Sequence, residues 1–218
     1  MEKAINIKGA IFDLDGTLLN SMDYWRKALG EFVASKGYTP PSDTEEKYMS
    51  NGIAFCHAEW VEKLGFPYDY ETTLKGVYDI MEKHYATDVF VKDGVFEMLD
   101  ALKARGVKMC LATATDHHVV DALTVRLGID KYFDKIFTCS DVGKGKRYPL
   151  IYERALEFLG TLKENTYVFE DAYYALTTAH TNGFKTVGIY DRNVLESPEK
   201  VKELCDFYTA DYKLVFED

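Results

Sequence analysis

Two aspartates two residues apart, Asp13 and Asp15, follow the first apolar run of the chain, residues 10–12. Residues i and i+2 of a strand lie on the same face, so the two carboxylates would share it. Asp13 could then attack phosphorus as a nucleophile, while Asp15 exchanges a proton with the leaving oxygen. Two close carboxylates repel each other, which favours a proton on one of them and suits that one to act as an acid.

Polar residues also stand at or after the ends of later apolar runs. Thr113 ends the run at 107–112, two lysines lie in the loop after residues 135–138, and Glu170 and Asp171 follow residues 166–169. The carboxyl ends of parallel strands meet at one edge of a sheet, so we expect these groups to lie near Asp13 and Asp15. A nucleophilic carboxylate, a second carboxylate, a hydroxyl, an ammonium and an acidic pair are the groups that phosphoryl transfer through an aspartyl-phosphate needs.

A phosphate that faces several carboxylates requires a cation to offset the negative charge. Oxygen ligands favour a hard cation, and Mg²⁺ binds through one or two carboxylates together with water and substrate phosphate. The simpler alternatives are a solvated acidic turn at Asp13 and Asp15, and a helix cap at Glu170 and Asp171. The combination of all the strand-end groups favours a magnesium-dependent phosphoryl-transfer site.

The elements that would position these residues alternate between strand and helix. From residue 91 onward this alternation predicts βαβ units, and therefore an α/β fold: a Rossmann-like parallel sheet with helices on both faces. The predicted strands cover residues 10–12, 107–112, 135–138, 166–169 and 185–190, with a possible sixth at 212–216, and the predicted helices cover residues 95–105, 118–127, 150–159 and 172–181.

Residues 21–90 have helical periodicity and little strand signal. Helices are expected at 24–35, 45–64 and 71–86, with breaks near Gly37, Pro40-Pro41, Gly65 and Pro67. The predicted domains are therefore an α/β core, 1–20 and 91–218, and an inserted helical domain, 21–90.

Composition narrows the possible partners and location. Lys and Arg total 26 against 36 Asp and Glu, a formal net charge of −10, which disfavours nucleic acid and anionic membranes as partners. Four scattered cysteines without a CxxC pair are expected to be reduced thiols. No signal-peptide pattern or membrane-spanning run is found, so a cytoplasmic location is expected. The sequence leaves the oligomeric state open.

Four motifs in order resemble those of the haloacid dehalogenase superfamily. They are Asp13-Leu-Asp15-Gly-Thr17, Leu111-Ala-Thr113-Ala-Thr115, a lysine before Tyr148-Pro149, and Glu170-Asp171. The helical block at 21–90 matches the place of the type-one cap, as in the subgroup that contains phosphoglycolate phosphatases and beta-phosphoglucomutase. The resemblance spans nearly the whole chain and implies a phosphatase that acts on a small phosphorylated metabolite.

The resemblance also implies a role for each matched position. Asp13 would be the nucleophile and a metal ligand, and Asp15 the acid/base whose backbone carbonyl also binds Mg²⁺. Thr113 and the backbone N–H of Ala114 would hold phosphate oxygens. A lysine would neutralise charge there: Lys146 fits the family spacing before Pro149, and Lys144 is the alternative. Asp171 would bind Mg²⁺, and Glu170 would bind it directly or support the residues that do.

Other functions are less consistent with these residues than a phosphatase. A sugar-phosphate mutase of the beta-phosphoglucomutase type is disfavoured, because Trp25 stands where that enzyme has a catalytic His and Phe55 where it has an Arg.

Dehalogenases and phosphonatases of the superfamily lack an aspartate at the position of Asp15, so the presence of Asp15 disfavours both. A phospho-receiver domain has its acceptor on a middle strand and no helical insert. A catalytically inactive binding protein is disfavoured because no motif residue is missing. The sequence does not identify the substrate.

Overall fold

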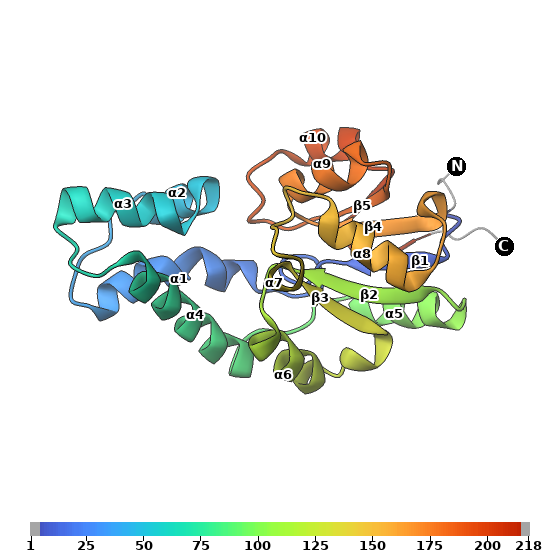
Figure 1. Cartoon of the computed structure of the whole chain (residues 1–218), viewed down its shortest axis with the longest axis horizontal. Helices are drawn as coiled ribbons and strands as arrows, with labels where there is room; N and C mark the ends of the chain where they lie inside the picture. The colour runs from blue at the N-terminus through green and yellow to red at the C-terminus, as the bar shows by residue number, and fades with distance from the viewer. Residues whose placement is uncertain (1–4, 215–218) are drawn as a thin grey trace. The chain divides into compact units, whose positions relative to one another are not determined.

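The structure is a computed structural model that describes residues 5–214 of the chain (Figure 1). The chain divides into two compact units. One consists of the residues up to Asn20 together with those from Phe90 onward, and the other is Ser21–Val89. The boundaries expected from the sequence are 20/21 and 90/91, and the structural ones are 20/21 and 89/90. We call the first the core unit and the second the helical unit.

The core unit is built on a six-stranded sheet in the order β3-β2-β1-β4-β5-β6, with every adjacent pair parallel. The order reverses between β1 and β4, because the chain adds strands first on one side of β1 and then on the other. Such a reversal leaves a crevice at the carboxyl ends of the two strands, where open α/β sheets bind their ligands. The strands are β1 Gly9–Phe12, β2 Lys108–Thr113, β3 Lys135–Thr138, β4 Thr166–Glu170, β5 Lys185–Ile189 and β6 Phe207–Thr209.

Helices cover both faces of this sheet. Right-handed connections place α5 and α6 on one face and α8, α9 and α10 on the other, because the chain changes direction along the sheet after β3. In Figure 1, α6 and α9 lie on opposite sides of the strands. The core helices are α5 Val95–Ala104, α6 His117–Leu127, α7 Cys139–Val142, α8 Leu150–Leu159, α9 Tyr173–Thr181 and α10 Pro198–Leu204, with short 3-10 turns at Asp130–Tyr132 and Lys163–Asn165.

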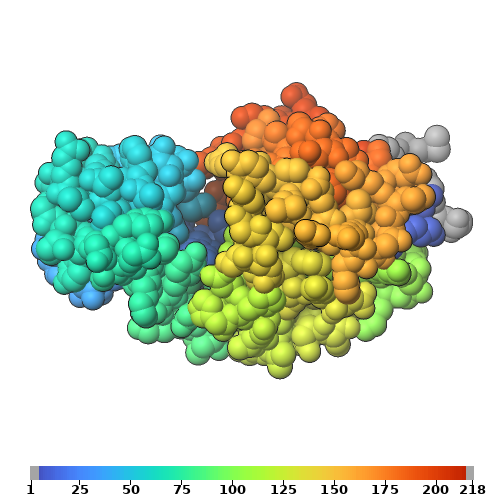
Figure 2. Space-filling model, in the orientation of Figure 1, coloured from blue at the N-terminus to red at the C-terminus, as the bar shows by residue number. Residues whose placement is uncertain are grey.

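The central strands are apolar on both faces, as expected for a parallel sheet covered on each side. On one face, Ile11 packs with Ile151 and Tyr152 of α8, all at most 1% exposed. The side chains of α8 and its flanking segments (yellow to orange) hide this face of the sheet in the space-filling view of Figure 2. On the other face, Phe12 stacks on Phe169 with ring centroids 4.3 Å apart. The Phe12–Phe169 contact joins β1 to β4, the two strands whose carboxyl ends carry the acidic residues.

The helical unit contains four helices and buries apolar faces of its own. Buried residues of α1 recur at helical spacing (Ala28, Leu29, Phe32 and Val33), and those of α4 do the same (Thr73, Val77, Met81 and Tyr85). The helices are α1 Met22–Ser35, α2 Thr44–Asn51, α3 Ile53–Leu64 and α4 Tyr70–Thr87.

Two expectations about elements were wrong. The helix predicted over 45–64 is two helices, because Gly52 separates α2 from α3 and glycine is a poor helix former. The possible strand at 212–216 is not seen at 212–214, and residues 215 and 216 lie outside the described residues. The last strand is instead β6, which pairs with β5. Tyr212 has a φ of +60°, which an extended strand does not allow. The helices α7 and α10 were not predicted.

The described residues also bear on the thiols and on membrane insertion. The four cysteines are free thiols, and Cys56 and Cys110 are buried. Within residues 5–214, no helix is both long and apolar enough to cross a membrane.

Candidate active site

The first aspartate is placed directly by the sheet. The N–H of Asp13 donates to the carbonyl of Phe169 at 2.9 Å, which extends the β1–β4 ladder by one residue, and Asp13 is 7% exposed. The chain then turns at Gly16, whose φ of +81° is accessible to glycine without steric cost. The turn closes through a hydrogen bond from Gly16 N–H to the Leu19 carbonyl at 3.1 Å. Asp13 and Asp15 are therefore fixed at the carboxyl end of β1, with Asp15 partly exposed.

Lys146 brings its ammonium group to this strand end. Its Nζ forms a hydrogen-bonded ion pair with Asp13 Oδ1 and donates to Glu170 at 3.2 and 3.4 Å from Oε1 and Oε2. The lysine side chain is 2% exposed. By contrast, Lys144 is exposed and lies over the ring of Tyr148. Lys146, which the family spacing favours over Lys144, is therefore the lysine that contacts Asp13.

The second motif ends strand β2 and supports the second aspartate. The N–H of Thr115 donates to Thr113 Oγ1 at 3.1 Å, and Thr115 Oγ1 donates to Asp15 Oδ2 at 2.6 Å. Thr113 and Thr115 are buried, and Ala114 between them is exposed. The turn after β2 thus lies beside Asp15, although Thr115 and Asp15 are 100 residues apart in the chain.

Three carboxylates gather at the reversal of strand order. Asp13, Glu170 and Asp171 each offer an oxygen, and these oxygens lie within 4.8 Å of one another. Asp171 Oδ1 accepts a hydrogen bond from Thr17 Oγ1 at 2.9 Å. The N-cap position of α9 is Ala172, so the Asp171 carboxylate does not occupy it. The helix-cap interpretation of this acidic pair therefore does not describe Asp171.

Burial of these like charges shifts their proton affinities. Burial, and then the charge of Asp13, raise the pKa of Asp171 to about 8, and the same two causes raise the pKa of Glu170 well above its ordinary value. Burial lowers the pKa of Lys146, but Asp13 and Glu170 outweigh it, so the pKa is raised and the amine stays charged. With all three carboxyl groups ionised, the cluster would carry more negative charge than the Lys146 ammonium offsets. The oxygen donors, their spacing and this excess all fit a hard divalent cation.

Some residues at the site were not assigned a role from the sequence. Thr17 and Thr115 lie inside the quoted motifs, and their hydroxyl groups in the segments after β1 and β2 were the available signal. Lys92 had no such signal. Its Nζ contacts the Gly16 carbonyl, donates to the Tyr190 carbonyl at 3.2 Å and pairs with Asp191 Oδ2 at 2.8 Å. It thereby ties the turn after β1 to the end of β5.

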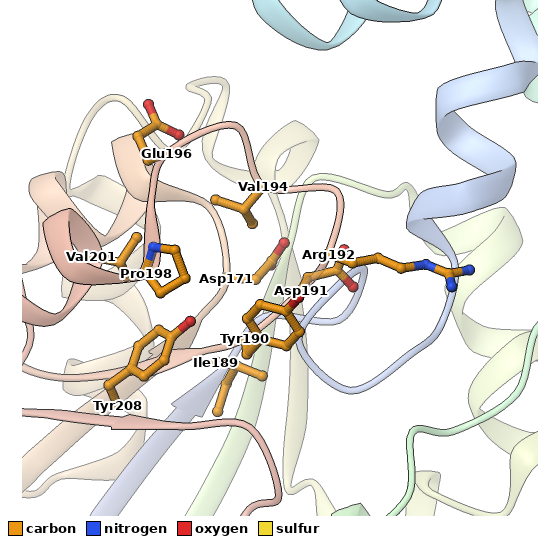
Figure 3. A pocket seen from close by; sticks show the side chains of 10 residues that line it. All are labelled: Asp171, Ile189, Tyr190, Asp191, Arg192, Val194, Glu196, Pro198, Val201 and Tyr208. Carbon is orange, nitrogen blue, oxygen red and sulfur yellow. The ribbon is translucent and has the colours of Figure 1, made fainter.

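A small cavity opens on one side of Asp171. Its volume is ≈ 190 Å³, and its lining includes Asp171, Asp191 and Ile189 of β5, which are labelled in Figure 3. The remaining lining residues come from the loop after β5, the start of α10 and strand β6: Tyr190, Arg192, Val194, Glu196, Pro198, Val201 and Tyr208.

The chain is an α/β protein with an acidic cluster at the carboxyl ends of its parallel strands, and comparison with known proteins places it in a family. Residues 10–189 match the family model described as haloacid dehalogenase-like hydrolase, and the chain belongs to this family. The protein CbbY of Rhodobacter capsulatus is 28% identical over 96% of this chain and 93% of its own length. A phosphorylated carbohydrates phosphatase of Thermotoga maritima is 26% identical over 83% of this chain and 84% of its own. The crystal structure of CbbY from Rhodobacter sphaeroides in complex with phosphate shares the fold, with a TM-score of 0.78, 20% identity, and coverage of 94% of this chain and 95% of that one.

The ion pairs of Lys146 lead to a stability prediction. Lys146→Met should lower the free energy of unfolding by about 3–5 kcal/mol in the presence of a chelator, because it leaves Asp13 and Glu170 buried without their cationic partner. Urea unfolding followed by circular dichroism measures the change. The matched control is Lys144→Met, which removes an exposed ammonium two residues away and should change stability by less than about 0.5 kcal/mol. Equal losses for the two variants would contradict the assignment of Lys146 as the buried partner.

Proposed function

We propose that this protein is a Mg²⁺-dependent phosphatase that hydrolyses a small phosphorylated metabolite through an aspartyl-phosphate on Asp13. The observation that carries the proposal is the meeting of Asp13 with the Lys146 ammonium and with two further carboxylates at the reversal of strand order. Membership of a hydrolase family, and relatives named as phosphatases, support the same chemistry.

The first chemical step is attack on phosphorus by a carboxylate oxygen of Asp13. A bond forms between that oxygen and phosphorus, and the bond from phosphorus to the leaving oxygen breaks. The Lys146 ammonium lies against Asp13 and offsets negative charge as the phosphoryl group arrives. Thr113, the last residue of β2, and the N–H of Ala114 after it are assigned to hold the phosphate oxygens.

Asp15 acts as the general acid in the first step and as the general base in the second. Thr115 donates to Asp15 Oδ2 and so fixes the carboxyl group at the partly exposed edge of the site. In the first step Asp15 gives its proton to the leaving oxygen, which becomes an alcohol. In the second step it takes a proton from water, the water oxygen attacks phosphorus, and the bond to Asp13 breaks. Inorganic phosphate leaves, and Asp13 and Asp15 return to their starting states.

The metal ligands assigned to this chain are the carboxylates of Asp13 and Asp171 and the backbone carbonyl of Asp15. Both carboxylate oxygens of Glu170 already lie near Lys146 Nζ, so Glu170 holds the lysine and adds negative charge beside the cation. When bound, Mg²⁺ supplies positive charge that allows an anionic phosphate to approach a carboxylate nucleophile. The negative charge that the cluster carries once its carboxyl groups are ionised supports this assignment.

The substrate class follows from the relatives and the insert. The Thermotoga maritima relative is named for phosphorylated carbohydrates, and we place this class first among the candidates. The helical unit is inserted between β1 and α5, where the type-one cap of the family occurs, and substrate selection is assigned to it. The mutase alternative gains no support from the structure: the indole N–H of Trp25 donates to Tyr85 at 2.8 Å, and Phe55 is an apolar side chain that is 49% exposed.

A panel of phosphorylated metabolites tests the function. Purified protein with Mg²⁺ should release inorganic phosphate from at least one phosphorylated carbohydrate, and the release should stop in excess chelator. Chromatography of the products separates a phosphatase, which yields free sugar and phosphate, from a mutase, which yields an isomeric sugar phosphate. Isomer formation without phosphate release would overturn the proposal in favour of the mutase.

The raised carboxyl pKa values predict how Mg²⁺ binding depends on pH. With its pKa near 8, Asp171 carries a proton at lower pH that Mg²⁺ must displace. The apparent affinity for Mg²⁺ should therefore rise with pH between about 6 and 7.5, by roughly tenfold per pH unit for each proton displaced. Calorimetric titration in two buffers of different ionisation enthalpy measures both the affinity and the number of protons released. An affinity that is constant over this range would contradict the prediction.

A further inference from the structure

Two side chains, the half-buried Lys92 and the buried Tyr212, hold consecutive backbone carbonyls in the turn that follows Asp15. The Nζ of Lys92 contacts the Gly16 carbonyl, and the hydroxyl of Tyr212 donates to the Thr17 carbonyl. Lys92 is 76 residues from Gly16 in the chain, and Tyr212 is 195 residues from Thr17. Two segments remote in sequence therefore hold the turn in place. Tyr212 binds the backbone of Thr17, the residue whose hydroxyl contacts Asp171.

Tyr212 has a left-handed backbone conformation that residues other than glycine rarely adopt. It is 4% exposed, and among residues 5–214 it is the one non-glycine residue with a positive φ, at +60°. A bulky residue persists there only when its surroundings fix it. The residue before it is held on both sides of its backbone. The Asp211 N–H donates to Thr209 Oγ1 at 3.3 Å, and a Cβ atom added to Gly94 would lie only 2.8 Å from the Asp211 carbonyl oxygen.

Thr17 connects this segment to the acidic cluster. Its carbonyl accepts from Tyr212, and its hydroxyl donates to Asp171 Oδ1 at 2.9 Å. All three residues are at most 4% exposed. The hydrogen bonds therefore run without solvent from the C-terminal segment to a carboxylate that the proposed function makes a metal ligand.

Asp171 needs such an anchor because there is space on its other side. Asp171 lines the cavity of ≈ 190 Å³ shown in Figure 3, and space next to its side chain would allow its carboxyl group to rotate away from Asp13 and Glu170. That rotation would relieve the repulsion among the three carboxylates, and it would separate the oxygens that have to converge on a cation. The hydrogen bond from Thr17 opposes the rotation.

We infer that Tyr212 is a positioning residue for metal binding, which fixes Thr17 so that Thr17 holds the Asp171 carboxylate toward the cation. The inference rests on the proposed function, because it assumes that Asp171 binds Mg²⁺. It assigns a role in the site to a residue near the C-terminus that lies outside all four motifs.

The test is calorimetric titration of the full-length protein with Mg²⁺ alone. Tyr212→Phe keeps the ring and removes the hydroxyl, and should weaken Mg²⁺ binding by about 3–10-fold. Thr17→Val removes the hydroxyl that contacts Asp171 and should weaken binding by about 10–100-fold, whereas Thr17→Ser keeps the hydroxyl and should restore most of the affinity. Tyr148→Phe, which removes a hydroxyl from a side chain that is 56% exposed, is the matched control and should bind as the wild type does.

The double variant Tyr212→Phe/Thr17→Val separates a positioning role from a general structural one. If Tyr212 acts through Thr17, adding Tyr212→Phe to Thr17→Val should cost little further affinity. Affinity losses that multiply in the double variant, or wild-type Mg²⁺ binding by Tyr212→Phe, would overturn the inference while leaving the proposed function intact. A wild-type protein that binds no Mg²⁺ would overturn both. Melting temperatures measured in chelator verify that each variant is folded.

Discussion

Asp13→Asn is expected to abolish turnover, with a loss on the order of 10⁴–10⁶-fold, the scale on which removal of a nucleophile acts in other covalent enzymes. The amide keeps the shape of the side chain and can still contact Lys146, but it is a poor nucleophile and carries no charge. No phosphoenzyme should therefore form. Rapid mixing with an aryl phosphate should show a burst of phenolate for the wild type and none for the variant.

The location of Asp13 makes this variant informative beyond the loss of rate. Asp13 is buried, and its carboxylate raises the pKa values of Asp171 and Glu170, so its neutralisation should leave the fold intact and reduce repulsion in the cluster. The matched control is Asp130→Asn, an exposed aspartate in a short 3-10 turn. A burst from Asp13→Asn equal to that of the wild type would remove Asp13 from the nucleophile role.

Much of the fold could be predicted from the sequence because its elements are marked locally. Leu150–Leu159 follows Pro149 and precedes Gly160, and the predicted helix has the same bounds as α8. The strands that carry the motifs were found because each is a short apolar run that stops at a polar residue. Gly52 was overlooked inside a helical pattern, and residues 212–216 were assigned to a strand on local composition alone.

The candidate site was predictable to the extent that its residues stand at strand ends. The parallel sheet brings Asp13 and Glu170 to one edge, and this follows from topology without knowledge of side-chain positions. The choice between Lys144 and Lys146 depended on which side chain points inward from an irregular loop, and the family spacing favoured Lys146 without excluding Lys144. Only the structure shows Lys146 buried against Asp13.

The contacts that no sequence pattern revealed are those between remote segments. Lys92 contacts Gly16, 76 residues away, and also Asp191. Tyr212 contacts Thr17, 195 residues away. A lysine after a helix and a tyrosine near the end of a chain are ordinary surface residues by composition. Their function depends on which backbone carbonyls the folded chain leaves within their reach.

Asp15→Asn is expected to lose activity in a way that depends on the leaving group. The variant keeps the backbone carbonyl assigned to Mg²⁺, and Asp13 remains able to attack. General acid help is typically worth about 10²–10⁴-fold, and it matters most when the leaving oxygen is a strong base. The first step should therefore slow by about that factor on a sugar phosphate and much less on nitrophenyl phosphate, whose phenolate leaves with little need of a proton.

The second step gives an independent measure of the same residue. Hydrolysis of the aspartyl-phosphate needs a base to activate water, and it is the same step whatever ester was used, so Asp15→Asn should slow it equally for both substrates. With nitrophenyl phosphate the variant should therefore show a burst followed by slow turnover, and with the sugar phosphate a slow first step and no burst. Thr115→Val, which removes the hydrogen bond to Asp15 Oδ2 but keeps the carboxyl group, should show the same dependence on leaving group with smaller losses. Equal first-step losses on the two esters would show that Asp15 does not protonate the leaving group, because an aryl and an alkyl oxygen differ in that need above all.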